Sequence, residues 1–147
     1  MDTLEIEKTL QSIDWFRGVF ACNMLPKGIV YNRPAGYVVN TDPSTLPGEH
    51  WVAIYLPLHG PGEYFDSFGQ PPINREIVNF LDKNSPSGWI YNTVQIQEAV
   101  STSTVCGNYT ILFLLSKLTR MSLCDFQLLY KRQPAHNDFI VEELFKP

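Results

Sequence analysis

Hydrophobic residues recur along the chain with two periods, one typical of helices and one typical of strands. The helical period predicts four helices, at Leu4–Trp15, Ile73–Lys83, Tyr109–Leu118 and Cys124–Tyr130. In the second of them, apolar residues are expected to share one buried side: Ile73, Ile77, Phe80 and Leu81. The third is apolar on nearly every side, and this predicts a helix that runs through the core.

Short apolar or alternating runs predict four strands, at Tyr37–Asn40, His50–Leu56, Glu63–Phe68 and Trp89–Gln97. The second and third are joined by residues 57–62, which are rich in proline and glycine, so an antiparallel hairpin is expected. Residues 20–34 contain Pro26, Gly28 and Pro34, which predicts irregular structure there. Separate helices with a mainly antiparallel sheet define an α+β fold.

The composition favours a globular protein of 147 residues, which predicts a single domain over residues 1–147. The net charge of −4 offers no general attraction for nucleic acid or an anionic membrane. The longest apolar run, Ile111 to Leu115, is too short to cross a bilayer. The N-terminal residues do not resemble a signal peptide, and three cysteines form no disulfide framework, so an intracellular location is expected. With no CxxC or HxxxH pair, a metal site is not expected.

Cys106 is the first candidate for chemistry. It follows a polar segment and precedes the long apolar helix, so its sulfur is expected in the first helical turn, where the helix dipole stabilises a thiolate. Gly107 beside it removes a side chain and leaves room for a substrate backbone. The alternative is a buried cysteine that packs as a small apolar residue.

The predicted hairpin brings His50 close to Asp66, so the chain offers a base and an acid to orient it. Asp66 interrupts an apolar run, where an acid is costly unless it is paired. The alternatives are a surface histidine and an acid on the wet face of the sheet. His59 and His136 stand in turn-like sequence and are expected to be solvated.

An oxyanion donor is also needed, and Gln97 upstream of Cys106 offers a side-chain amide alongside the Cys106 backbone N–H. Gln95 is a rival two residues earlier on the same face. The residues alone leave that choice open.

These residues occur in an ordered pattern: Asn40-Thr41, then Gly48-Glu49-His50-Trp51, then Tyr64-Phe65-Asp66-Ser67-Phe68-Gly69, then Gln97, then Cys106-Gly107-Asn108-Tyr109. The pattern resembles the adenovirus protease (adenain) and the adenain-like proteases of large virus-like DNA transposons. Their clan includes the SUMO-deconjugating enzymes. The likeness spans roughly residues 16 to 118.

The resemblance implies a papain-like cysteine protease fold with permuted chain order, its sheet packed on a central helix that begins near Cys106. It implies that His50, Asp66 and Cys106 form the catalytic triad. Trp51 matches the tryptophan that narrows the substrate channel to small residues such as glycine. Gln97 stands farther from the cysteine than the family glutamine usually does, which implies a short insertion within residues 98–104.

The function predicted is a thiol endopeptidase that cleaves capsid or core precursor proteins of the same virus or element after small residues. No cofactor is required by default, and a peptide or DNA activator is suggested only by analogy with adenain. The location implied is the host cytoplasm or nucleus, and the virion. Two alternatives stay open: a deconjugating protease for ubiquitin-like modifiers, and a binding module that keeps the fold without catalysis.

Overall fold

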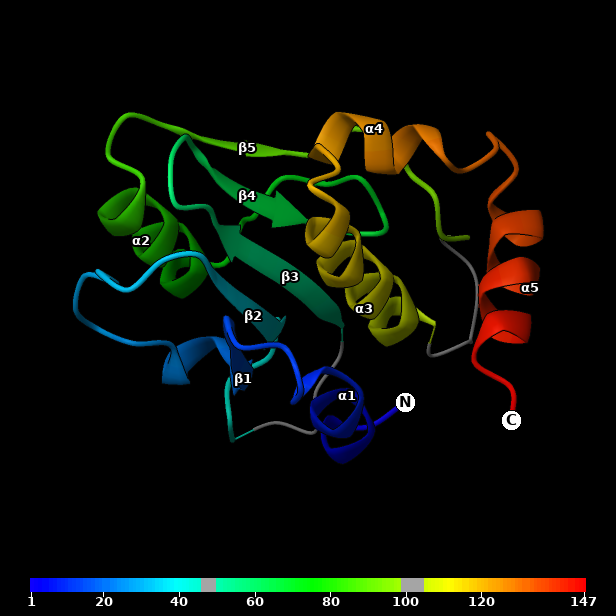
Figure 1. The fold of residues 1–147 in the computed structure, drawn as a ribbon, viewed down its shortest axis with the longest axis horizontal. Coiled ribbons are helices and arrows are strands. Elements are labelled where there is room, and N and C mark those ends of the chain that lie inside the picture. The colour runs from blue at the N-terminus through cyan, green and yellow to red at the C-terminus, as the bar shows by residue number, and fades with distance from the viewer. Residues whose placement is uncertain (46–49, 99–104) are drawn as a thin grey trace.

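A five-stranded sheet with helices against both faces organises the chain (Figure 1). The computed structural model describes residues 1–45, 50–98 and 105–147. The strands are β1 (Phe16–Ala21), β2 (Ala35–Asn40), β3 (Trp51–Leu56), β4 (Gly62–Phe65) and β5 (Trp89–Tyr91). The helices are α1 (Thr3–Leu10), α2 (Arg75–Asn84), α3 (Cys106–Ser116), α4 (Leu123–Leu128) and α5 (Pro134–Leu144), with short 3₁₀ turns at Cys22–Met24 and Lys117–Thr119.

The strands lie in the sheet in chain order, β1-β2-β3-β4-β5. The three central strands pair antiparallel, and each edge strand joins its neighbour in parallel. The expected hairpin is present as β3 and β4, with Ala53 opposite Phe65. His50 therefore lies just before β3 and Asp66 just after β4, at one end of the hairpin. The expected α+β class is confirmed.

Two hydrophobic clusters cover the two faces of the sheet. One contains the buried residues of α3 together with residues of α1, α4 and α5, and the other contains the buried residues of α2. Strand β3 contributes to both, because Ala53 packs in the first cluster while Val52 and Ile54 pack in the second. The central helix expected from the sequence is α3, although Leu118 beyond its end is exposed.

Helix α2 begins later than its periodicity suggested. The Asn74 side chain accepts hydrogen bonds from the backbone N–H groups of Glu76 and Ile77, which makes Asn74 the N-cap. Ile73 then precedes the helix, and its side chain is 94% exposed. The prediction that Ile73 lies on the buried side was therefore wrong.

Three other elements differ from the sequence expectation. The strand expected over Trp89–Gln97 ends at Tyr91, because the Asn92 side chain bonds to the backbone N–H and C=O of Asp66 in place of a strand residue. Strand β1 was not predicted, and its last two residues, Phe20 and Ala21, lie in the segment expected to be irregular. Helix α5 was not predicted either. No helix in the described parts of the chain is long and apolar enough to cross a membrane.

Candidate active site

Cys106 is the first residue of α3, as the sequence predicted. Its side chain is nearly buried, with 7% exposed. The preceding Val105 provides no side-chain cap, so the free N–H groups of the first turn remain near the sulfur. The positive end of the helix dipole therefore acts directly on Cys106.

His50 and Asp66 form a close pair at the end of the β3–β4 hairpin. The distance from His50 Nε2 to Asp66 Oδ1 is 2.7 Å. Asp66 is 6% exposed, so the alternative of an acid on the wet face of the sheet was wrong. A second hydrogen bond, from the backbone N–H of Phe68, fixes the same carboxylate oxygen at 2.9 Å.

The His50 ring also contacts the sulfur of Cys106. A hydrogen bond joins His50 and Cys106, and because Nε2 is bound to Asp66, Nδ1 is the ring nitrogen left for the sulfur. Burial alone would lower the pKa of His50, but the bonds to Asp66 and Cys106 outweigh it and raise the pKa to about 9. The ring therefore holds its proton through the neutral range.

The pKa of the Cys106 thiol is shifted in the opposite direction, downward. Burial would raise the pKa of Cys106, but hydrogen bonds from His50 and from the backbone N–H groups of Trp51 and Gly107 lower it below its ordinary value. A raised histidine pKa and a lowered thiol pKa together favour the imidazolium–thiolate pair.

Aromatic and backbone contacts hold this pair in place. The Phe68 ring stacks on His50, with centroids 4.6 Å apart and planes 22° apart. The peptide groups of Asp66 are clamped by Asn92, whose side chain accepts from one N–H at 2.9 Å and donates to the C=O at 2.6 Å. Neither Phe68 nor Asn92 was singled out from the sequence, although Phe68 stands only two residues after the candidate acid.

Gln97 is buried beside the turn that follows Asp66. Its Oε1 accepts a hydrogen bond from Ser67, and its backbone N–H bonds to the Ser67 C=O at 3.0 Å. Gln97 Nε2 has no partner among the described residues, so this N–H group is free to donate. Gln95 is exposed, and its Nε2 donates to the Gln97 C=O at 2.9 Å. The amide of Gln95 is therefore engaged, whereas that of Gln97 stays available as the predicted oxyanion donor.

Gly69 is needed where this turn meets the segment after β5. Its φ of +71° favours glycine, and a Cβ there would lie 2.7 Å from the backbone of Val94 and Gln95. The close contact brings the Asp66 turn and the Gln97 segment together.

Trp51 and Gly107 lie against each other at the start of α3. A Cβ built on Gly107 would lie 3.4 Å from the Trp51 ring, 3.4 Å from Ile6 and 3.5 Å from Met1. These are ordinary contact distances, so the space that Gly107 leaves is bordered by these three residues, and its role as substrate space stays a prediction. Trp51 is partly buried and packs on the α3 cluster.

The remaining histidines and cysteines take no part in the hydrogen bonds that join Cys106, His50 and Asp66. His59 and His136 are exposed, as expected, although His136 is in α5 and not in a turn. Cys22 is buried and Cys124 is exposed. No cluster of three potential metal ligands occurs among the described residues. The loop at Pro47–Glu49 and most of the predicted insertion, at residues 99–104, lie outside the described residues.

Comparison with known proteins agrees with this geometry. The chain is 30% identical over 112 residues, or 68% of its length, to the "Cysteine protease S273R" of an African swine fever virus isolate from Malawi. It has the same identity to the "SUMO-1 cysteine protease S273R" of a South African isolate. The chain is a homologue of this viral protease. The expected relationship to adenain-like proteases is thereby confirmed. No family model matches the sequence.

The homology covers part of the viral protease. The aligned region is 41% of the length of each of these relatives. A crystal structure of the African swine fever virus protease superposes with a TM-score of 0.62 at 22% identity, covering 99% of this chain and 67% of the other. The viral protease and this chain therefore share a fold, and the papain-like prediction is confirmed.

Proposed function

We propose that the chain is a cysteine endopeptidase in which Cys106 is the nucleophile, His50 the acid and base, and Asp66 the residue that orients the ring. The observation that carries this proposal is the hydrogen-bonded series from Cys106 through His50 to Asp66. The homology to a viral cysteine protease supports the same reaction.

The reaction follows from the positions of these groups. The Cys106 thiolate attacks the carbonyl carbon of the scissile bond, a carbon–sulfur bond forms, and the negative charge moves to the carbonyl oxygen. His50 gives its proton to the nitrogen as the carbon–nitrogen bond breaks, which releases the amine and leaves a thioester on Cys106. Water then loses a proton to His50 and attacks the thioester, which frees the acid and restores the thiolate.

The negative oxygen needs donors, and we assign this role to Gln97 Nε2 and the Cys106 backbone N–H. Replacing Gln97 by Ala is expected to lower kcat about 10²- to 10³-fold, because one oxyanion donor is lost. The matched change, Gln95→Ala, removes an exposed amide and is expected to cost much less. Steady-state kinetics on one peptide substrate measures both. Equal losses in the two variants would contradict the assignment.

The proposed substrates are precursor proteins of the same virus or element, cleaved after small residues. Trp51, which lies beside the sulfur, is the residue that we propose limits the substrate to small side chains next to the scissile bond. The proposal requires no cofactor. We place the enzyme in a reducing intracellular compartment such as the host cytoplasm or nucleus, which agrees with its free cysteines.

Alkylation by iodoacetamide across a pH series tests the ion pair directly. The lowered pKa of the Cys106 thiol predicts that Cys106 is still modified at a pH at which ordinary thiols, with a pKa near 8.5, are protonated. Mass spectrometry locates the label, and exposed Cys124 is the internal control. If Cys106 reacted only above about pH 8, as an unperturbed thiol does, the ion pair would be absent. A non-catalytic binding module would then be favoured.

A second function is suggested by the name of some relatives, "SUMO-1 cysteine protease". A deconjugating enzyme would use the same three residues on a modifier protein. Incubation with a ubiquitin-like modifier that carries a C-terminal electrophile, beside a short peptide with the same electrophile, separates the two functions. Faster labelling of Cys106 by the peptide supports the endopeptidase, and faster labelling by the modifier supports the deconjugase.

A further inference from the structure

A cavity lies against the catalytic pair on the side of the sheet that faces α2. His50, Asp66 and Phe68 form one wall, and Tyr64 and Ile77 lie deeper. The cavity has a volume of about 570 Å³, within the range of ligand-binding pockets. Cys106 is not among the residues that line it. His50 therefore contacts both the sulfur and the cavity.

The described lining offers no free counter-charge for a charged ligand. Among the described residues that line the cavity, only His50 and Asp66 carry charge at neutral pH, and these two are bound to each other at 2.7 Å. Burial raises the pKa of Tyr64 above its ordinary value, so its phenol stays neutral. A charged side chain in this cavity would lose water without gaining a counter-ion, and an apolar side chain would not have that cost.

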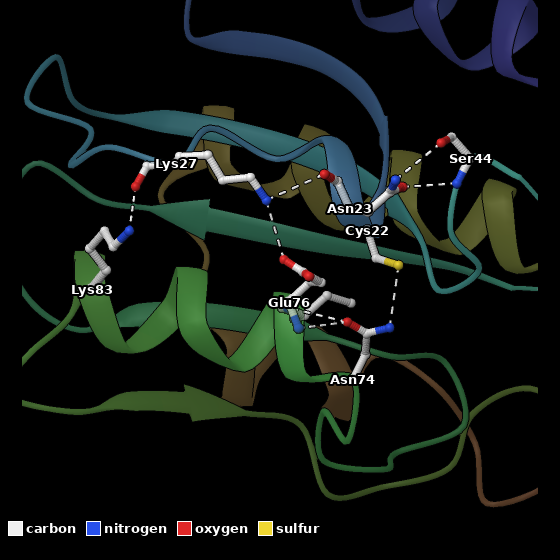
Figure 2. Close-up of polar contacts among 8 residues, drawn as sticks. Cys22, Asn23, Lys27, Ser44, Asn74, Glu76 and Lys83 are labelled. Carbon is white, nitrogen blue, oxygen red and sulfur yellow. Dashed lines mark hydrogen bonds and ion pairs between the residues drawn. The ribbon is translucent and has the colours of Figure 1, made fainter.

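The amide of Asn74 at the cavity edge is already used. Its Nδ2 donates to Cys22 Sγ at 3.3 Å and to the Thr41 C=O at 3.3 Å, and its Oδ1 accepts from the first turn of α2. Figure 2 shows Asn74 between Cys22 and Glu76, held by these bonds. Asn74 therefore contributes shape to the cavity and little hydrogen-bonding capacity.

An exposed isoleucine stands at the same cavity. Ile73 lines the cavity and is 94% exposed, although the sequence pattern suggested a buried position. Pro71 beside it adds a second apolar surface. An exposed apolar side chain at the wall of a cavity without a free counter-charge is suited to cover an apolar ligand.

The reaction places one part of the substrate on this side of His50. The acyl part is bonded to Cys106, and the leaving nitrogen must lie within hydrogen-bond reach of the His50 ring. Strand β3 packs against α3 through Ala53 and against α2 through Val52, so the sulfur and the cavity lie toward different faces of the sheet. Because His50 bonds to Cys106 and also lines the cavity, a chain that continues past the His50 ring from the leaving nitrogen reaches the cavity.

We propose that this cavity is a specificity subsite for the residue that follows the scissile bond, called P1′, and that it selects a large apolar side chain there. The inference rests on the proposed endopeptidase function and adds a substrate preference to it. The preference is independent of the small residue expected before the scissile bond.

Matched peptides test the subsite. A set of fluorogenic peptides that differ only at P1′, with Leu, Phe, Lys or Glu, is compared by kcat/KM. Burial of a large apolar side chain predicts roughly tenfold to a hundredfold faster cleavage of the Leu and Phe peptides than of the Lys and Glu peptides. Equal rates across the set would overturn the proposal while leaving the endopeptidase function in place.

Substitution of Ile73 tests whether the P1′ preference arises from this cavity. Ile73→Asp is expected to reduce the preference for Leu over Lys at P1′ by at least about tenfold, because it adds a negative charge at the cavity. Because Ile73 is exposed, the variant is expected to fold as the wild type does, and a thermal melt checks this. Leu58→Asp, in the β3–β4 turn with Leu58 62% exposed, is the matched control and should retain the wild-type preference. An unchanged P1′ preference in Ile73→Asp would show that this cavity is not the P1′ subsite.

A binding measurement separates the subsite from the catalytic proposal. In a Cys106→Ala variant with labelled isoleucine methyl groups, dipeptide amides that begin with Leu, Lys or Glu are titrated by NMR. The Leu compound is expected to shift the Ile73 and Ile77 signals, and the charged compounds are expected to leave them in place. Absence of a shift with the Leu compound contradicts the subsite. Failure of wild-type protein to cleave any peptide, with the shift present, contradicts only the endopeptidase.

Discussion

Replacing Cys106 by Ala is expected to abolish peptide cleavage. The variant keeps His50, Asp66 and Gln97 but has no atom that can form the thioester, so the loss in kcat should reach at least about 10⁴-fold. The methyl group of alanine fits the nearly buried position at the first turn of α3. A peptide-cleavage assay with purified protein measures the loss.

The fold of this variant should stay intact, because Cys106 contributes one small side chain to the core. Circular dichroism and a thermal melt provide the control, and Cys124→Ala, which removes an exposed thiol, is the matched variant with expected wild-type activity. Cleavage by Cys106→Ala at the wild-type rate would show that another residue is the nucleophile.

Replacing Asp66 by Ala has the next largest expected effect. Without the carboxylate, His50 loses the bond at 2.7 Å that fixes its ring and tautomer, and kcat is expected to fall about 10³- to 10⁴-fold. The backbone clamp from Asn92 to residue 66 does not depend on the side chain, so the turn should persist. Kinetics at saturating substrate, with a melt to verify folding, measures the effect.

The Asp66→Asn variant separates the role of Asp66 in orienting the His50 ring from the role of its negative charge. Its amide oxygen still accepts hydrogen bonds from His50 and the Phe68 backbone, so its loss should be smaller than that of Asp66→Ala. Asp66 raises the pKa of His50 toward about 9, and without its charge the pKa falls. The high-pH limb of the rate profile should therefore move to lower pH. Equal activity and an unchanged profile in both variants would mean that Asp66 has no part in the reaction.

The sequence contained enough information for the catalytic pair because the pair is local. His50 and Asp66 belong to one hairpin, and its turn and alternation determine which residues meet at its open end. The position of Cys106 was equally local, because the polar-to-apolar change marks the start of α3. That the hairpin and the helix meet at the same point depended on the resemblance to adenain-like proteases.

Other parts depended on contacts between distant segments. The alternation after Trp89 predicted a strand to Gln97, but Asn92 and Gly69 replace strand pairing with side-chain and close backbone contacts to the Asp66 turn. No local pattern in the sequence distinguishes these two arrangements. The cavity was missed for the same reason, since Ile73 fits a helical period and is excluded from α2 only by the Asn74 cap.

The contact between Ser67 and Gln97 has a consequence for how activity is lost. Ser67 follows the acid directly and binds both the side chain and the backbone of the proposed oxyanion donor. Local unfolding of residues 92–97 would release two groups in a single event: Asp66, which orients the His50 ring, and Gln97, which is proposed to stabilise the oxyanion. Damage to this contact should therefore abolish catalytic activity in one cooperative step, with no intermediate population in which only one of the two groups stays in place.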